Sequence, residues 1–398
     1  MQADPHVAGF VAPGFEPCLD AFRARLADGH ELGAACAVHW KGATVVDLWG
    51  GVADSTSASL WERDTLVPVF SATKGVAALC ILLLVAQGRL SLDQPVAAYW
   101  PEFAAHGKDR VTVREALAHR AGVPVIRGPL TIQDLQDLPG MAARLAAEAP
   151  LFEPGSAYFY HAFTVGWISS ELVRRTTGRS LGQWFRDELA RPLELNIEIG
   201  RGPSQAGQVA RIECPAELDV EIPDPDGVAS RSISLGGLIR PSAGGLAAAI
   251  NNPAMQAVEL AGANGLADAR SLAKLYASVC DDGQGGRLIP ADVLDDACRV
   301  VSDGAMWGGD IPGATCGAGL MLPFGSHPLL GPGAFGHNGA GGSLAAAHRP
   351  SGLGFAYLRN RMGNTMVFDP QVYGMVRVVA ECAGLPVPEV LQETAGAA

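Results

Sequence analysis

An unbroken run of apolar residues extends from Val76 to Ala86, directly after Ser71-Ala72-Thr73-Lys74. A segment that is apolar on all sides is typical of a helix buried at the centre of a protein. The run is shorter than the roughly 18 residues that a membrane-spanning helix needs. We therefore predict a buried central helix from Ser71 to about Gln87, with Gly88 as its C-terminal cap.

Extended apolar segments occur towards both ends of the chain, whereas helical periodicity dominates its middle. Strands are predicted over residues 34–40, 44–49, 317–323, 335–340, 344–349 and 353–360. Further helices are predicted over residues 113–119, 134–148, 163–177, 181–190, 268–280 and 370–383. This distribution favours an α+β fold, in which one antiparallel sheet is built from both termini and flanked by helices.

The same pattern predicts how the chain is divided. We expect residues 1–95 and 255–398 to form the sheet region and residues 96–254 to form a mainly helical region. Within the helical region, Gly, Pro, Ser and Asp cluster over about 200–253, which predicts a long irregular segment. Such a segment often forms a lid or a wall of a site, and an inert surface excursion is the alternative.

Composition excludes several classes of function. The 398 residues are 48% hydrophobic and 18% charged, which is typical of a globular protein. A net charge of −12 argues against nucleic acid or an anionic membrane as a partner. The eight cysteines contain no C-x-x-C pair and no basic-apolar leader is seen at the N-terminus, which favours a cytoplasmic protein with reduced thiols. No spacing typical of a metal site occurs, so neither metal nor cofactor is predicted.

Ser71 and Lys74 are the first candidates for chemistry. Residues three apart share one face of a helix, and a helix N-terminus supplies free N–H groups and partial positive charge. Lys74 lies against apolar residues with no carboxylate in the next turn, and desolvation lowers the pKa of such an amine. The pair therefore suits a nucleophilic serine activated by a lysine base. A capping serine beside an unrelated lysine is the alternative.

Two other serines match catalytic patterns in a less suitable context. The S-x-x-K pattern recurs at Ser271-Leu272-Ala273-Lys274, but we expect Ser271 to lie inside a helix with its amide in a backbone bond. The G-x-S-x-G pattern at residues 178–182 requires a preceding strand. A helix is predicted there instead, so Gly178 is expected to end that helix and Ser180 to cap the next one.

Two later segments can complete a site. Tyr160 follows the Pro154-Gly155 turn and precedes a predicted helix, where a side chain can reach into a cleft, and an aromatic core is the alternative. Residues 335–343 carry His337-Asn338-Gly339 and several further glycines. Glycine on a strand often marks the close approach of a ligand or backbone, and a simple turn is the alternative. A backbone N–H at this edge can complete an oxyanion hole.

In this order and spacing, the three elements resemble those of the serine penicillin-recognising enzymes. The likeness runs over about residues 15–380 and is strongest to the family VIII carboxylesterases, relatives of class C β-lactamases and D,D-peptidases. The resemblance implies a β-lactamase/transpeptidase-like fold. It also implies that Ser71 attacks an acyl carbonyl while Lys74 and Tyr160 relay protons as general base and acid.

The resemblance assigns further roles to the glycine-rich strand. The backbone amides of Ser71 and Ala340 would hold the oxyanion, and His337, Asn338 and Gly339 would contact the substrate. Water would then hydrolyse the acyl-enzyme.

The sequence departs from the lactamase pattern at two positions. The tyrosine motif ends in Ala162, where the lactamases have asparagine, and the strand motif begins with His337, where they have lysine. Lysine is a cation suited to the carboxylate of a β-lactam or a peptide, whereas histidine is mostly neutral at pH 7. We therefore predict a carboxylesterase that cleaves small short-chain esters, with weak β-lactamase activity as a side reaction.

Three rival functions stay open at this point. The first is an acyltransferase or amidase of the same fold, and the second is a β-lactamase or D-amino-acid peptidase. The third is a sensor or binding protein that is acylated once and does not turn over. The sequence gives no indication of the oligomeric state.

Overall fold

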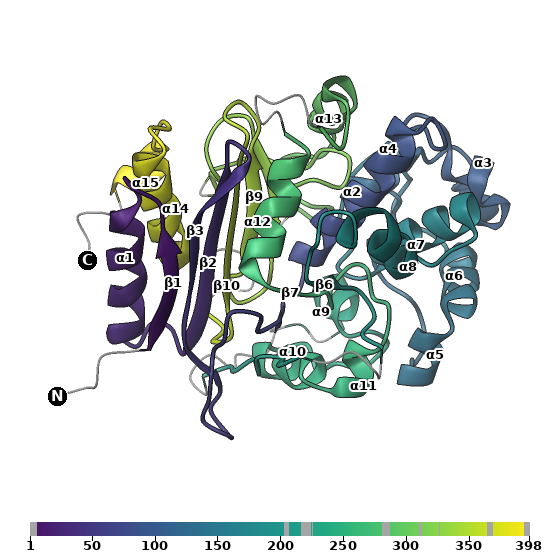
Figure 1. The fold of residues 1–398 in the computed structure, drawn as a ribbon. Helices are drawn as coiled ribbons and strands as arrows, with labels where there is room; N and C mark the ends of the chain where they lie inside the picture. Colours follow the sequence, from purple (N-terminus) through teal and green to yellow (C-terminus); the bar gives the residue numbers. More distant parts are fainter. Residues whose placement is uncertain are drawn as a thin grey trace.

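A large antiparallel sheet lies between two helical layers (Figure 1). The computed structural model describes residues 6–202, 207–215, 224, 226–280, 287–309, 313–325, 327–363 and 369–393. Within them the sheet has the strand order β1-β3-β2-β10-β9-β8, and β4 pairs with β3. Its strands are β1 (Val7–Val11), β2 (Gly33–Trp40), β3 (Ala43–Asp54), β4 (Ser59–Leu60), β8 (Ala334–Asn338), β9 (Leu344–His348) and β10 (Leu353–Arg359).

The two ends of the chain meet in the middle of this sheet. β10 pairs antiparallel with β2, from Gly354 opposite His39 to Arg359 opposite Ala34. β2 in turn pairs with β3, and β10 with β9. The prediction of one antiparallel sheet assembled from both termini is confirmed.

The two faces of the sheet carry side chains of different size. Cys36 and Phe355 belong to a core shared with the terminal helices α1 (Glu16–Ala27) and α14 (Pro370–Cys382). The opposite face is built from small residues and packs against α12 (Ala269–Ser278). A Cβ at Gly354 would lie 2.1 Å from the carbonyl oxygen of Ala273, so only glycine lets the helix approach this closely.

The predicted central helix is confirmed as α2 (Ala72–Ala86), whose residues from Ala72 to Leu84 are all buried. It lies beyond α12 in Figure 1 and contacts both β8 and α7 (Thr164–Thr177). Gly88 has φ 69°, the left-handed conformation expected of a residue that ends a helix. Among the described residues, none of the helices has both the length and the apolar character needed to cross a membrane.

The remaining elements are a small sheet of order β5-β7-β6 and further helices, of which α15 lies beside α14. The short strands are β5 (Val67–Pro68), β6 (Ile197–Glu198) and β7 (Leu266–Ala267). The helices are α3 (Val96–Tyr99), η1 (Pro101–Gly107), α4 (Val113–Leu117), α5 (Ile132–Gln136), α6 (Leu138–Ala147), α8 (Leu181–Phe185), η2 (Arg186–Ala190), α9 (Val228–Ile233), α10 (Ala243–Ile250), α11 (Pro253–Gln256), α13 (Ala291–Ala297) and α15 (Glu389–Glu393).

Several sequence predictions need correction. The helix predicted over 134–148 is two helices, because Asp137 leaves the helical conformation and caps α6 with its side chain. The strand predicted over 317–323 is wrong: its residues make only isolated bridges, and Gly319, with φ 79°, interrupts the extended chain. The pattern reading also missed β1 and α1 altogether.

The segment predicted as irregular over about 200–253 is only partly so. It contains α9 and α10, and residues 203–206, 216–223 and 225 within it lie outside the described part of the chain. The division into regions 1–95 plus 255–398 and 96–254 stays a prediction.

Candidate active site

Ser71 stands at the turn between β5 and α2. It occupies the N-cap position of α2, but its side chain accepts no capping hydrogen bond. Phe70 before it has φ 48°, a left-handed conformation that a bulky residue rarely adopts. The Thr73 hydroxyl donates to the Phe70 carbonyl at 2.6 Å and accepts from the Gly265 amide at 2.8 Å, which holds the turn in place. The capping interpretation of Ser71 is therefore wrong, and its Oγ is free for other partners.

Lys74 is buried beside that hydroxyl. Its Nζ lies 2.9 Å from Ser71 Oγ and donates to the carbonyl oxygens of Ala162 at 2.7 Å and Gly262 at 2.6 Å. Burial lowers the pKa of Lys74 to about 7, because the ammonium loses its hydration. In the neutral amine, the two hydrogens stay on the carbonyls and the lone pair faces Ser71. This geometry can move a proton from the serine to the lysine.

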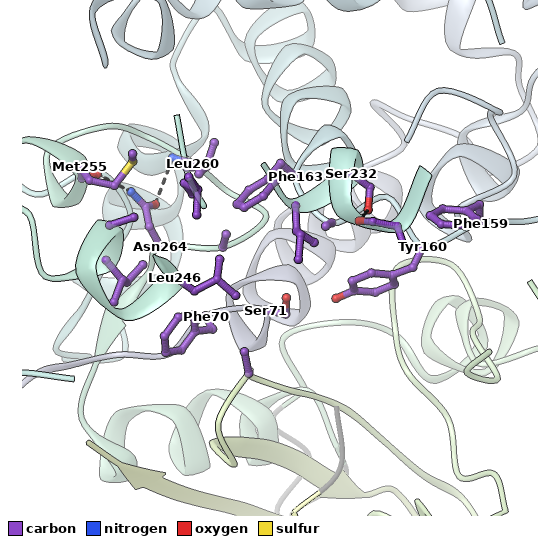
Figure 2. Close-up of a pocket in the computed structure, with 18 of the residues that line it drawn as sticks. Phe70, Ser71, Phe159, Tyr160, Phe163, Ser232, Leu246, Met255, Leu260 and Asn264 are labelled. Atoms are coloured by element: carbon purple, nitrogen blue, oxygen red, sulfur yellow. Dashed lines mark hydrogen bonds between the residues drawn. The ribbon is translucent and has the colours of Figure 1, made fainter. Parts of the chain in front are cut away.

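Tyr160 approaches Ser71 from another side. Figure 2 shows its hydroxyl directed towards Ser71, and Lys74 Nζ lies 4.8 Å from the centre of its ring. Burial raises the pKa of the phenol, and a hydrogen bond with Ser71 lowers it by a smaller amount. The phenol is therefore protonated at neutral pH and can donate a proton to a group bound at Ser71.

His337 lies on β8 and faces the same group of residues. Its ring centre is 6.3 Å from that of Tyr160, and its Nδ1 lies 2.7 Å from the carbonyl oxygen of Asn338. Because that oxygen can only accept, Nδ1 carries the hydrogen. Burial, reinforced by nearby Lys74, lowers the pKa of His337 to about 3. The imidazole is thus neutral at pH 7, as expected from the sequence, and supplies no cation.

The end of β8 reaches the nucleophile turn through Gly339. A Cβ at this position would lie 2.2 Å from the carbonyl oxygen of Val69, so glycine is required for the close approach. Ala340 and Ser71 line the same cavity. Neither of their amides donates a backbone hydrogen bond within the described residues. Two such N–H groups at one cavity can donate hydrogen bonds to the oxyanion that forms when a serine attacks a carbonyl.

Sequence reasoning missed two further histidines behind Tyr160. The ring of His119 lies 4.8 Å from that of Tyr160, and its Nδ1 accepts the amide hydrogen of His161 at 3.1 Å. Burial lowers the pKa of both imidazoles, that of His161 to about 4. His119 follows α4 with φ 67°, which no sequence pattern indicates. The neutral ring of His119 packs against Tyr160, and that of His161 lies 5.8 Å from that of His119, so neither adds charge.

The structure excludes the two other serines from this site. Ser180 caps α8 and donates to Glu259, and Gly178 ends α7 with φ 75°, as predicted. The prediction for Ser271 needs correction. It lies in the first turn of α12, and its amide donates to the Asp268 side chain at 2.7 Å instead of to the backbone. Its hydroxyl accepts the amide hydrogen of Asn196, so it is engaged in local structure.

A cavity of about 260 Å³ opens at Ser71 (Figure 2). Its walls come from α9, α10 and α11, which lie within or directly after the segment predicted as irregular, and from the residues before α12. The interpretation of that segment as a wall of a site is supported by these contacts.

Comparison with known proteins identifies the family. The profile described as Beta-lactamase matches residues 19–377 of the chain. The chain belongs to the β-lactamase family. This family member is 33% identical over 95% of its length to the esterase/β-lactamase LipL of Mycobacterium tuberculosis (strain ATCC 25618 / H37Rv), of which it covers 90%.

Solved structures agree with the family assignment. A family VIII carboxylesterase is 34% identical to this β-lactamase-family protein, with a TM-score of 0.84 over 95% of this chain and 100% of the other. A penicillin-binding protein homologue from Caulobacter crescentus is 35% identical, with a TM-score of 0.83 over 95% and 100% of the two chains. The β-lactamase-like fold and the resemblance to penicillin-recognising enzymes are confirmed.

Proposed function

We propose that this protein is a serine esterase of the family VIII type, which cleaves short-chain carboxylic esters through an acyl-enzyme on Ser71. The observation that carries the proposal is the 2.9 Å contact between Ser71 Oγ and Lys74 Nζ, together with the pKa of about 7 for that amine. A base with a pKa near the working pH combines a large deprotonated fraction with useful basicity.

The proposed reaction begins with proton transfer from Ser71 to Lys74 while Oγ attacks the acyl carbonyl. The amides of Ser71 and Ala340 bind the oxyanion, and each such donor is worth about 3–4 kcal/mol in related reactions. Tyr160 gives its proton to the leaving alcohol and regains one from the Lys74 ammonium. Water then attacks the acyl-enzyme and passes one proton through the Tyr160 hydroxyl to Lys74, and the Lys74 ammonium returns a proton to Ser71 Oγ as the carboxylic acid leaves.

The neutral state of His337 favours esters over carboxylated lactams as substrates. His337 is neutral, so the position at which the lactamases carry lysine supplies no partner for a carboxylate. The relative LipL is named for both esterase and β-lactamase activity, which makes β-lactam hydrolysis the second candidate function. Hydrolysis of a chromogenic cephalosporin tests it, and we expect a far lower kcat/KM than for a neutral ester. The proposal also includes a cytoplasmic location, which the absence of disulfides among the eight described cysteines favours.

The test of the esterase function is hydrolysis of p-nitrophenyl acetate and butyrate by wild type, Ser71→Ala and Ser180→Ala. We expect Ser71→Ala to lose several orders of magnitude in kcat, as other nucleophile deletions do, and Ser180→Ala to keep it. Loss of activity confined to Ser180→Ala would show that Ser71 is not the nucleophile. A burst equal to the enzyme without turnover would identify an acylated sensor instead.

A further inference from the structure

The cavity at Ser71 has a wall that is apolar over most of its surface. Leu246 and Ala249 of α10, Ile233 of α9 and Phe163 before α7 contribute to it. No charged side chain lines the cavity within the described part of the chain. A ligand that fills this space must therefore be apolar and uncharged, because a buried charge without a partner is costly.

The polar residues of the wall are already occupied. The Asn264 side chain donates to the carbonyl oxygens of Met255 and Val258, and it accepts the amide hydrogen of Leu260 at 3.1 Å. The Ser232 hydroxyl donates to the Ala229 carbonyl at 2.7 Å. These groups hold the wall together and offer little to a polar ligand.

The position of the apolar wall relative to Ser71 and Tyr160 indicates which part of an ester it contacts. In Figure 2, Leu246, Met255 and Leu260 lie on the opposite side of Ser71 from the Tyr160 hydroxyl. A proton donor must lie beside the leaving group, so an alcohol protonated by Tyr160 departs on the Tyr160 side. The acyl group then extends the other way, into the part of the cavity that Leu246, Met255 and Leu260 line.

We infer that this cavity is a binding site for an unbranched aliphatic acyl chain of about six to ten carbons. The inference rests on the proposed esterase function and extends its substrate range beyond acetate and butyrate. A cavity of about 150 Å³ binds benzene, with six carbons. The 260 Å³ here includes the side lined by Phe159 and Tyr160, so by that proportion about ten carbons is the upper bound for the acyl chain.

The first test is a series of p-nitrophenyl esters from acetate to palmitate. Each buried methylene should raise kcat/KM by up to about fourfold, with a maximum near hexanoate to decanoate and a fall beyond it. A second series of acetate esters with lengthening alcohols should show no such maximum. A maximum at acetate, or a chain-length dependence confined to the alcohol series, would overturn the inference.

Variants of α10 supply matched controls. Ala249 lines the cavity and neighbouring Ala248 is exposed, so Ala249→Phe fills the cavity while Ala248→Phe does not. We expect Ala249→Phe to lower kcat/KM for octanoate at least tenfold and for acetate less than threefold. Leu246→Ala should move the maximum to longer chains. Equal chain-length profiles for the two phenylalanine variants, with thermal unfolding showing both folded, would contradict the acyl site.

A binding measurement separates this inference from the proposed function. Ser71→Ala retains the cavity without the nucleophile, so titration calorimetry can follow p-nitrophenyl octanoate and acetate without turnover. Tighter binding of octanoate by at least tenfold supports the acyl site even if the wild type hydrolyses no ester, which would overturn only the proposed function. Equal affinity for the two esters would overturn the inference whatever the turnover.

Discussion

At the scale of single residues, the candidate site depends on a lysine that is buried without a carboxylate partner. Lys74 Nζ is held by the carbonyl oxygens of Ala162 and Gly262. These carbonyl partners fix the amine in place, but they carry no negative charge that would offset the charge of the ammonium. Burial therefore keeps the pKa of Lys74 near 7. An Asp or Glu in their place would favour the charged form and remove the base.

The first prediction concerns pH. Deprotonated Lys74 is the active form, and its lowered pKa of about 7 means that kcat/KM should rise tenfold per pH unit below 7 and level off above it. The phenol of Tyr160, with its raised pKa, stays protonated over the plateau. A pH profile of p-nitrophenyl butyrate hydrolysis, corrected for the spontaneous reaction, measures this rise, the rising limb of the profile.

His337→Gln is the control for that profile. The pKa of His337 is about 3, so its titration does not contribute near pH 7. The rising limb should remain within about half a pH unit of its wild-type position in this variant. Disappearance of the limb would identify His337, and not Lys74, as the titrating base.

The second prediction replaces the neutral imidazole by a cation. His337→Lys should lower the KM for 4-acetoxybenzoate relative to phenyl acetate by roughly three- to tenfold, because the free carboxylate on the leaving phenol, which departs on the Tyr160 side, gains a partner. The added charge beside Lys74 should also lower the pKa of that amine and move the rising limb to lower pH. An unchanged KM ratio would show that His337 does not set the preference for neutral substrates.

At the scale of elements, segments distant in sequence build the site. β5 ends at the strained turn before Ser71, α2 carries Lys74 directly after that turn, and the end of β8, far along the chain, brings Ala340 to the same cavity. Thr73 of α2 holds the turn, since its hydroxyl contacts both the Phe70 carbonyl and the Gly265 amide, which directly precedes β7. The site therefore depends on how closely β8 approaches β5.

The third prediction tests that approach. Gly339→Ala would place a Cβ 2.2 Å from the Val69 carbonyl oxygen, so the end of β8 must move and carry the Ala340 amide with it. We expect kcat to fall about 10²- to 10³-fold, the effect of removing an oxyanion donor, with little change in KM. Steady-state kinetics on p-nitrophenyl butyrate checks this.

Gly336→Ala is the matched control on the same strand. Its Cβ would lie 2.3 Å from the Ala345 carbonyl oxygen, within the sheet and away from the nucleophile turn. It should lower the free energy of unfolding by about 1–3 kcal/mol while the folded fraction keeps most of its activity. An equal loss of kcat in both variants would mean that general damage to the sheet, not the oxyanion hole, explains Gly339→Ala.

Elements with a strong local pattern were predictable from the sequence, and those defined by packing were not. The apolar run after Lys74 indicates α2 without any tertiary information. Helix α1 buries Cys18, Phe22 and Leu26 at helical spacing, but the apolar residues Ala24 and Ala27 lie on its exposed face and reduce the contrast between the two faces. The apolar stretch over 317–323 is buried by its surroundings although it forms no strand.

The residues of the candidate site divide in the same way, into those that a motif indicates and those that packing brings to the site. Ser71, Lys74 and Tyr160 occur in recognisable motifs, so the sequence indicated them before the structure brought them together. The contribution of α10 to the cavity follows from tertiary packing, because Leu246 and Ala249 are ordinary apolar residues of an alanine-rich helix. His119 likewise reaches Tyr160 only through the fold.

At the scale of the whole molecule, the two chain ends stabilise each other on the sheet face opposite α12. Helices α1 and α14 pack together there. Arg359 at the end of β10 forms buried ion pairs with Glu31 at 2.8 Å and Asp369 at 2.6 Å. The N-terminal and C-terminal parts are therefore joined by buried contacts, and β9, which follows Ala340, pairs with β10 in the same sheet.

The last prediction uses this contact between the ends. Cys18 of α1 and Cys382 of α14 are 364 positions apart, yet their Sγ atoms lie 3.9 Å apart. Diamide can take two electrons and two protons from the two thiols, and a disulfide would then link the helices. The partly exposed Cys382 reacts first, because burial raises the pKa of the Cys18 thiol and keeps it protonated.

Oxidation should leave six of the eight thiols titratable and lower the mass by about two daltons, the two hydrogens lost when a disulfide forms. Closing so long a loop restricts the unfolded chain, so the free energy of unfolding should increase by about 2–5 kcal/mol. Because the pair lies on the face opposite α12, kcat/KM for p-nitrophenyl butyrate should not change. Cys18→Ala should show neither the mass change nor the stabilisation. Retention of all eight thiols in the oxidised wild type would mean that the helices hold the two sulfur atoms in a geometry that cannot form the bond.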